Sequence, residues 1–403
     1  MKRAMHDEMT DFSNTEIAFS SYSEKDLGKS YWLYRLMNNP FLVRIANTMA
    51  VFGLKMKLPI NWLIKKTVFR QFCGGETIEQ SMAVVKKLAE SHIFSILDYS
   101  VESGGREADY DATAAEIVSI INTAGSNRNI SYTSLKMNGL SRHGVMEKLQ
   151  KRGVEGLTAG EKEEYGRIKA RLENICWVAT EKKVPFYVDA EESWIQGSVD
   201  ELVLEMMRKY NREWAVVSTT LQMYIRDKIQ YLHKCFETAE KEGFYLGVKF
   251  VRGAYWEKER KRAALMGYPS PVYDQKKDTD EAYNEAISFS LNHIDRIVVD
   301  NATHNEESSM LMAKLMDEKD IARNHPHAWF SQLMGMSDHI SYNLADAGYN
   351  VSKYIPYGPV RSVLPYLIRR AQENTAISGQ MSRELRLIIK ERKRRKQKGR
   401  CRN

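Results

Sequence analysis

The chain contains 403 residues with a formal net charge of +8, and its hydrophobic fraction of 43% is ordinary for a globular protein of one or two domains. No apolar run reaches the roughly 18 residues that a membrane-spanning helix needs, and residues 1–14 are too polar for us to expect a secretory signal or transit peptide. The four cysteines have no CxxC spacing, which disfavours a zinc site and fits a reducing cytoplasm.

The position of the positive charge is more informative than its size. Residues 390–402 contain nine Lys or Arg and one Glu, so their net charge equals the net charge of +8 of the whole chain. The remainder is formally neutral, which disfavours a nucleic-acid-binding face. We therefore expect residues 381–403 to be a basic tail without ordered structure. A peripheral contact of this tail with anionic lipid is the second interpretation.

Residues 1–90 show interrupted apolar patterning without alternation, which predicts an N-terminal helical arm. From 91 to 380 the pattern changes to short apolar, often β-branched runs. Helical stretches are predicted between them, at 113–124, 199–210, 225–242, 279–292, 306–317 and 337–347. The eight runs are 94–101, 130–137, 185–189, 215–221, 246–251, 296–301, 328–333 and 351–355.

Several of these runs lack alternation, as strands buried on both faces do. Eight strand–helix repeats predict a (β/α)8 TIM-like barrel over 91–380. The alternative is an open doubly wound sheet, but the Gly-rich first turn typical of that fold is not found. A charge-dense segment around 139–180 is too long for one barrel helix, and we expect a solvated helical insertion without a catalytic role.

Barrel enzymes place their active sites at the carboxyl ends of the strands. Polar side chains at all eight predicted ends indicate a site large enough for a cofactor and a substrate. No zinc motif, Walker loop or GxSxG elbow is present, so we expect no metal. The polar residues are Asp98, Glu102, Lys136, Asp189, Glu191, Glu192, Gln222, Tyr224, Lys249, Arg252, Tyr255, Thr303, His304, Asn305, Gln332, Tyr354 and Tyr357.

The segment after the last predicted strand carries adjacent arginines, Arg369 and Arg370, on a helix that Pro365 is expected to open. The planar donor fork of arginine binds carboxylates through two parallel hydrogen bonds. The pair therefore predicts a clamp for a small carboxylic acid. The alternative is a solvated helix face with an Arg369–Glu373 ion pair.

Seven ordered blocks between about residues 70 and 380 resemble the proline dehydrogenase family. They are Phe-Cys-Gly-Gly-Glu76, Leu-Asp-Tyr-Ser-Val-Glu102, Val-Asp-Ala-Glu-Glu192, Val-Lys-Phe-Val-Arg-Gly-Ala-Tyr-Trp-Glu-Lys-Glu259, Ala-Thr-His-Asn305, Gln-Leu-Met-Gly-Met336, and Tyr-Ile-Pro-Tyr-Gly358 with Pro-Tyr-Leu-Ile-Arg-Arg-Ala-Gln-Glu-Asn374. The resemblance implies an FAD enzyme on a (β/α)8 barrel. Such an enzyme oxidises L-proline to 1-pyrroline-5-carboxylate and passes the electrons to a membrane quinone.

The resemblance also implies roles for individual residues. Arg369 and Arg370 match the pair that binds the proline carboxylate, and Tyr354 matches the tyrosine on the proline ring. The remaining substrate contacts implied are Lys136, Tyr255, Tyr366 and Glu373. The cofactor contacts implied are Asp189, Ala190, Gln222, Lys249, Arg252, Gly253, Ala254, Thr303, His304, Asn305 and Gln332.

Asp189, Lys249 and Tyr354 are the expected catalytic residues. Many bacterial members of the family carry arginine where this chain has Lys249, near the reactive flavin nitrogen. At this position the mitochondrial branch of the family resembles this chain more closely. Either side chain keeps a positive charge beside the flavin. The group that accepts the amine proton is left open between Asp189 and water.

The length predicts the single-activity form, because bifunctional members add a second catalytic domain. We expect a cytoplasmic protein, peripheral on the inner membrane face if the tail binds lipid. Three alternatives stay open: hydroxyproline oxidation, which the bulk of Tyr354 disfavours; a Schiff-base lyase using Lys136 or Lys249; and a non-catalytic membrane scaffold.

Overall fold

Eight parallel strands form a closed barrel in the order of the sequence, which confirms the predicted (β/α)8 class. Core strand residues such as Val248, Phe250 and Phe330 are fully buried, because strands in such a barrel are covered on both faces. The strands are β1 Phe94–Tyr99, β2 Ile130–Lys136, β3 Phe186–Asp189, β4 Val217–Gln222, β5 Leu246–Val251, β6 Ile297–Ala302, β7 Ala328–Leu333 and β8 Val351–Tyr357.

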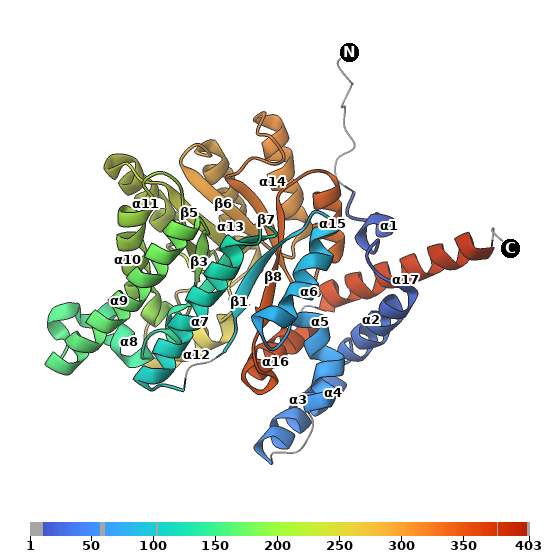
Figure 1. Cartoon of the computed structure of the whole chain (residues 1–403), viewed down its shortest axis with the longest axis horizontal. Coiled ribbons are helices and arrows are strands. Elements are labelled where there is room, and N and C mark those ends of the chain that lie inside the picture. Colours follow the sequence, from blue (N-terminus) through green and yellow to red (C-terminus); the bar gives the residue numbers. More distant parts are fainter. Residues whose placement is uncertain (1–10, 57–60, 102–103, 377, 401–403) are drawn as a thin grey trace. The chain divides into compact units, whose positions relative to one another are not determined.

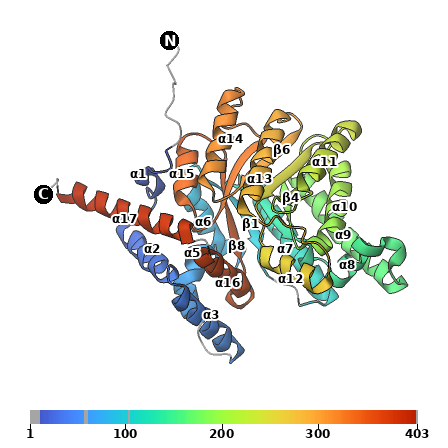
Figure 2. The same cartoon turned by 180° about the vertical axis from the view of Figure 1, so that it is seen from behind.

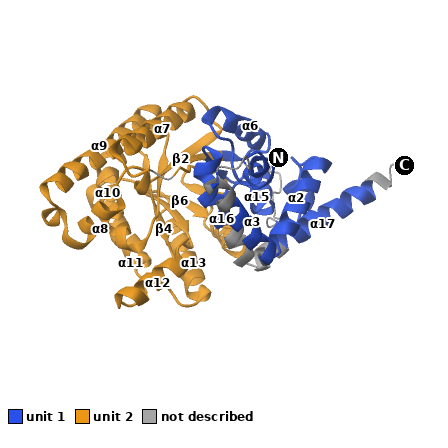
Figure 3. Ribbon diagram, turned by 90° about the horizontal axis from the view of Figure 1, so that it is seen from below, with its two compact units in different colours: residues 1–94, 332–403 blue, residues 95–331 orange. Residues whose placement is uncertain are grey.

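The computed structural model describes residues 11–56, 61–101, 104–376 and 378–400; for residues 40, 51–55, 371–376, 378–382 and 399–400 it describes the backbone alone. The chain forms two compact units, coloured separately in Figure 3. Unit 1 comprises residues 1–94 and 332–403, and unit 2 comprises residues 95–331. The predicted division into an arm at 1–90, a barrel at 91–380 and a tail at 381–403 stays a prediction.

Unit 2 contains most of the strands, with helices packed around them (Figures 1 and 2). The segment around 139–180 supplies most of α8 and α9; its assignment as an insertion stays a prediction. One helix, α12, was not predicted. The helices of unit 2 are α7 Glu107–Gly125, α8 His143–Arg152, α9 Ala159–Lys182, α10 Ser193–Tyr210, α11 Lys228–Glu242, α12 Trp256–Met266, α13 Lys276–Asn292 and α14 Glu306–Glu318, with short 3-10 turns η2 Met137–Gly139 and η3 Val154–Gly156.

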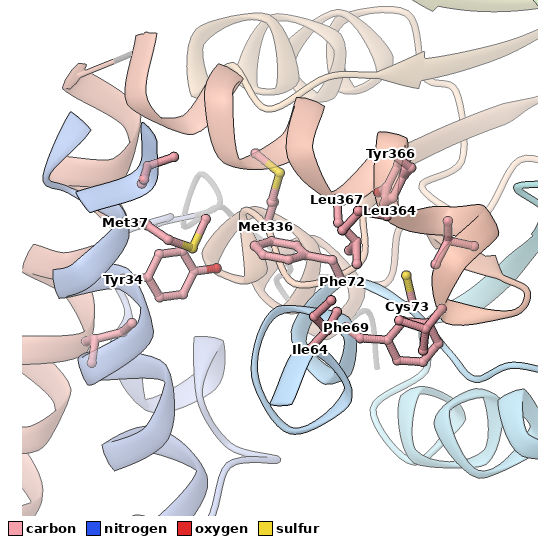
Figure 4. Close-up of a cluster of buried hydrophobic side chains, with 14 of the residues drawn as sticks. Tyr34, Met37, Ile64, Phe69, Phe72, Cys73, Met336, Leu364, Tyr366 and Leu367 are labelled. Atoms are coloured by element: carbon pink, nitrogen blue, oxygen red, sulfur yellow. The ribbon is translucent and has the colours of Figure 1, made fainter. Parts of the chain in front are cut away.

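Unit 1 is mainly helical, as predicted for the N-terminal residues. Its helices are α1 Thr15–Ala18, α2 Glu24–Met37, α3 Pro40–Lys55, α4 Asn61–Ile64, α5 Arg70–Phe72, α6 Ile78–Ala89, α15 Asp338–Asp346, α16 Val360–Ala376 and α17 Ser378–Arg400, with a π-helical turn η1 Lys65–Phe69 between α4 and α5. A buried apolar cluster joins the two ends of the chain within this unit. Tyr34, Phe72, Met336 and Leu367 lie in that cluster (Figure 4).

The start of α16 differs from the prediction. The helix begins at Val360, so Pro365 lies inside it rather than opening it. Proline is tolerated best in the first helical turn because it lacks a backbone N–H. The expected position of the helix start was therefore wrong by five residues.

The described part of the basic tail is helical, so the expectation of disorder was wrong for residues 381–400. Residues 378–400 form α17, on which Leu387, Ile388 and Glu391 are buried. The Arg395 guanidinium donates to the Phe19 carbonyl oxygen at 2.8 Å and to Glu391 at 2.7 Å. Lys390 Nζ donates to the Ser13 carbonyl oxygen at 2.7 Å. Lys390 and Arg395 thus bond to carbonyl oxygens of the N-terminal segment, which the local sequence could not reveal.

Candidate active site

A row of alternating charges lies at the carboxyl ends of four strands of unit 2. Lys136 ends β2, and its Nζ lies 3.3 Å from Oδ1 of Asp98 on β1 and 3.2 Å from Oδ2 of Asp189, the last residue of β3. Lys249 on β5 forms an ion pair with the other oxygen of Asp189. The predicted residues Lys136, Asp189 and Lys249 are thus brought together, and Asp98 completes the row.

The row is most open at Lys136 and is buried at both ends. The Lys136 side chain is 28% exposed, whereas the side chains of Asp98 and Lys249 are 1% and 5% exposed. Lys249 Nζ lies 4.6 Å from the centroid of the Tyr187 ring, which stacks on Tyr132 at 4.4 Å. Ion pairing and the ring face both stabilise the charged ammonium group in this apolar setting. The Lys249 end of the row therefore consists of an amine enclosed between a carboxylate and a ring face.

Asp300 is a site residue that the sequence reading missed. It lies on β6 in register with Lys249 on β5, and it is 1% exposed. Its Oδ2 accepts a hydrogen bond from the Ser331 hydroxyl at 2.8 Å. Burial raises the pKa of Asp300 to about 6, although the Lys249 charge opposes the rise. A carboxylate within the apolar run of β6 was the signal available in the sequence.

Asp300→Asn is expected to gain stability, relative to the wild type, as the pH rises. The folded-state pKa of Asp300 lies above its ordinary value of 3.8. Its contribution to stability is therefore fully present below about pH 4 and is lost as the pH rises through about 6. The amide does not titrate, so the stability difference should shift by about 2–3 kcal/mol between these limits. Denaturant unfolding across this pH range measures the shift. Parallel pH profiles for Asp300→Asn and the wild type would contradict the assignment of a raised pKa to Asp300.

Backbone and amide contacts fix the turn after β5. The Gln222 side chain, at the end of β4, accepts from the Ala254 N–H at 3.1 Å and donates to the Glu191 carbonyl oxygen at 2.7 Å. Gly253 has a φ of +137°, and a Cβ there would lie 2.5 Å from the Tyr224 ring. Only glycine fits this position. The predicted residues Gln222, Gly253 and Ala254 thus form one rigid turn.

Glu191 is buried beside this turn. Its side chain accepts from the Asn138 N–H at 2.8 Å, and its other carboxyl oxygen has no hydrogen-bond partner among the described residues. Burial raises the pKa of Glu191 to about 7. Ala190, between Glu191 and Asp189, is partly exposed.

Arg252 connects β5 to the loop after β6. Its guanidinium donates to Asp280 at 2.6 Å, to the Thr303 hydroxyl at 2.6 Å and to the Ser308 hydroxyl at 2.9 Å. Asn305 caps α14 by accepting from the Ser308 N–H at 2.8 Å. The arrangement places an arginine and a threonine at the N-terminus of a 13-residue helix.

Two further predicted residues of unit 2 are less enclosed. His304 is partly exposed between Thr303 and Asn305. Tyr255 is partly exposed and precedes the first residue of α12, and Lys258 Nζ lies 5.9 Å from its ring centroid.

The remaining predicted residues belong to unit 1. Gln332 is buried and accepts from the Ser341 hydroxyl at 2.7 Å. Tyr354 on β8 and Tyr366 on α16 are each 9% exposed. Arg370 Cζ lies 5.4 Å from the Tyr366 ring centroid.

Arg369 is partly exposed, and its buried Nε has no hydrogen-bond partner among the described residues. Such a group is suited to an external acceptor. The side chain of Glu373 lies outside the described part of the chain, so neither its proposed role nor the Arg369–Glu373 pair is tested.

Comparison with known proteins gives matches over most of the chain. The family model described as proline dehydrogenase matches residues 81–383. A protein of Dictyostelium discoideum named "Proline dehydrogenase 1, mitochondrial" is 33% identical, over 93% of this chain and 74% of that protein. "Carbapenem antibiotics biosynthesis protein CarD" of Pectobacterium carotovorum subsp. carotovorum is 35% identical, over 79% of this chain and 82% of that protein.

Solved structures support the barrel. Proline utilization A from Bdellovibrio bacteriovorus, inactivated by N-propargylglycine, superposes with a TM-score of 0.69 at 20% identity. The match covers 92% of this chain but 39% of that longer chain. At this identity the likeness concerns the fold.

Proposed function

The chain belongs to the proline dehydrogenase family, and from this premise we propose that it oxidises L-proline to 1-pyrroline-5-carboxylate with bound FAD and a membrane quinone as electron acceptor. The observation that supports this most is the charge row Asp98–Lys136–Asp189–Lys249. It lies at the carboxyl ends of the strands, where barrel enzymes hold their reacting groups.

The charge row also separates this proposal from the lyase alternative. A Schiff base forms on an unprotonated lysine amine. Lys136 and Lys249 are both ion-paired with carboxylates, so neither amine is presented to a substrate as an isolated nucleophile. Lysines held in such ion pairs suit an enzyme that must stabilise an anionic reduced cofactor.

The residues of unit 2 fit a flavin dinucleotide in the chemistry of their donors. Arg252 has five N–H groups, three of which are engaged by Asp280, Thr303 and Ser308. Its guanidinium is thereby held beside the N-terminus of α14, a position suited to phosphate. We assign the phosphate groups to Arg252, Thr303 and His304. The flavin ring is assigned to Asp189, Gln222, Lys249 and the Gly253–Ala254 turn.

When bound, the flavin supplies the acceptor for the hydride. The protein residues bind and orient the substrate. Arg369 and Arg370 bind the carboxylate, with Lys136 as a further cation, and Tyr354 with Tyr255 and Tyr366 confines the ring. Orientation of this kind can account for a large part of the rate of a two-reactant step. Asp189, held between Lys136 and Lys249, keeps both ammonium groups in place.

The proposal also concerns the location of the protein. Because the electron acceptor is a membrane quinone, the proposal includes a peripheral association of the protein with that membrane. Among the described residues, none of the helices combines the length with the apolar composition that a bilayer span requires.

FAD is expected to be bound without a covalent bond. The family blocks contain no Cys or His in a known flavin-attachment context, and Cys73, Cys176 and Cys235 are buried. Denaturation followed by filtration should release all of the yellow colour into the filtrate. Colour that remains with the unfolded chain would contradict this expectation.

Tyr354→Ser is expected to change substrate preference. The side chain is 9% exposed, and removing the ring should cost packing against proline while making room for a ring hydroxyl. The ratio of kcat/KM for hydroxyproline to kcat/KM for proline should rise about tenfold to 200-fold. This change corresponds to a difference in activation free energy of a few kcal/mol at most. Steady-state kinetics with both substrates and an artificial acceptor measures this ratio.

Tyr357→Phe provides the control at the same strand, because Tyr357 is fully buried and is not assigned to the substrate. An unchanged ratio in Tyr354→Ser would remove Tyr354 from the pocket. Parallel loss of both activities together with a lower Tm would indicate a packing role instead. The proposed function itself fails if the wild-type protein, reconstituted with FAD, turns over neither proline nor hydroxyproline.

A further inference from the structure

The N-terminal helices of unit 1 expose an unusual number of large apolar side chains. Of the fifteen such side chains that are exposed in the described part of the chain, nine lie between residues 32 and 63. We call six of them the N-terminal apolar surface: Trp32 and Leu36 on α2, Phe41, Ile45 and Met49 on α3, and Trp62 on α4. Isolated exposed apolar residues are common, but so many within one segment of about thirty residues point to an interaction surface.

Helix α3 shows the arrangement most clearly. Phe41, Ile45 and Met49 follow one another at intervals of four residues and therefore share one face. They are 69%, 41% and 67% exposed, whereas Val43 is buried in the apolar cluster of unit 1. The helix is thus anchored on one side and presents an apolar stripe on another. An amphipathic helix of a globular domain normally directs such a stripe into the core.

Charge identifies the kind of partner. Residues 27–75 contain eight Lys or Arg and no Asp or Glu, although the chain as a whole contains 52 acidic residues. Basic groups also lie directly against the exposed indoles. Lys66 Nζ is 4.2 Å from the Trp62 ring centroid, and Arg35 Cζ is 5.6 Å from that of Trp32. Tryptophan and basic residues flanking an aliphatic stripe are typical of helices that lie in a membrane interface.

We propose that the N-terminal apolar surface docks onto an anionic lipid bilayer, with α3 parallel to the membrane plane. A second copy of the chain fits less well, because a symmetric contact would bring two acid-free basic segments together. The C-terminal residues are a weaker candidate as well. Arg394, Arg395 and Lys398 of α17 are engaged by Glu16, Glu24 and Glu391.

The surface refines the membrane association in the proposed function and replaces the basic tail as its principal contact. The docking proposal rests on the proposed function in one respect, namely that the quinone acceptor is dissolved in the bilayer. Lipid binding is measured without turnover, so failure of the docking surface and failure of proline oxidation can be distinguished.

The test is flotation of the full-length FAD-reconstituted protein with phosphatidylcholine vesicles, with and without phosphatidylglycerol. Wild-type protein should float with the anionic vesicles. The triple variant Phe41→Ser, Ile45→Ser, Met49→Ser should bind at least about tenfold more weakly. Arg44→Gln with Lys66→Gln should weaken binding about fivefold per residue, because each basic group near the surface contributes a similar amount.

Matched controls lie elsewhere on the chain. Leu265 and Met266 at the end of α12 are 75% and 61% exposed, and Leu265→Ser with Met266→Ser should bind vesicles like the wild type. Lys393→Gln with Lys396→Gln changes exposed basic residues of α17 and should have a smaller effect than Arg44→Gln with Lys66→Gln. An unchanged melting curve and unchanged turnover with an artificial acceptor would show that the triple variant is folded.

Three results would overturn the proposal. The first is a wild-type protein that does not bind anionic vesicles, and the second is a triple variant that binds them as the wild type does. The third is a wild-type dimer that becomes monomeric in the triple variant without any change in lipid binding. That result would assign the surface to a second copy of the chain.

Discussion

Lys249→Met is expected to lower the free energy of unfolding by about 3–5 kcal/mol near pH 8, the usual loss when one partner of a buried ion pair is removed. The Lys249 side chain is 5% exposed and pairs with Asp189, while buried Asp300 lies in register on the neighbouring strand. Removing the ammonium group leaves three carboxylates, Asp98, Asp189 and Asp300, with Lys136 as the one remaining cation of the row.

The loss should become smaller toward about pH 5, because Asp300 can then bind a proton in place of its cationic neighbour. Burial already raises the pKa of Asp300 to about 6 with Lys249 present, and loss of the cation raises it further. Chemical denaturation at several pH values measures both the size of the loss and its trend.

Lys249→Arg serves as the matched variant, since it keeps the charge and adds volume. It should retain most of the stability and measurable proline turnover. A stability change below about 1 kcal/mol in Lys249→Met, well under the usual range for a buried pair, would show that Lys249 does not balance Asp189 and Asp300.

Arg369→Ala and Arg370→Ala are each expected to raise the KM for proline by about 10-fold to 150-fold, corresponding to the loss of a charge-assisted contact of about 1.5–3 kcal/mol. The buried Nε of Arg369 has no hydrogen-bond partner among the described residues. Removing this side chain should therefore affect ligand binding far more than folding. Steady-state kinetics and melting curves are measured on the same preparations.

Arg361→Ala is the control on the same helix, because Arg361 is exposed near the start of α16. Its KM should match that of the wild type. The clamp is ruled out if both Arg369→Ala and Arg370→Ala keep a near-normal KM. A KM increase accompanied by an equal loss of stability would indicate a structural role.

The strands were predictable because their residues obey a local rule. Runs such as Phe186–Val188 and Ile297–Val299 are apolar without alternation, as required for a sheet covered on both faces. Helix α12 was missed because residues 257–262 are all charged. It is held through buried Glu259, whose carboxylate accepts from the Ser193 N–H at 2.7 Å. That partner is remote in sequence.

The strand-end pattern identified residues that lie together, since Lys136, Asp189 and Lys249 are neighbours in the folded chain. Their roles in a site stay a prediction. Asp300 was missed because the residues named for the end of the sixth strand, Thr303, His304 and Asn305, all follow β6, whereas Asp300 lies within it. The tail was misjudged for a related reason. Net charge was counted along residues 390–402, but the acceptors for those charges lie near residues 13–24.

Mixing the FAD-reconstituted protein with L-proline in the absence of oxygen and other acceptors tests flavin-dependent proline oxidation most directly. The proposed function predicts loss of the visible absorbance of oxidised flavin and formation of 1-pyrroline-5-carboxylate in equal amounts. Arg369→Ala should need a correspondingly higher proline concentration for the same bleaching. A protein that binds FAD but keeps the oxidised spectrum with saturating proline, or that does not bind FAD, would contradict the proposed function.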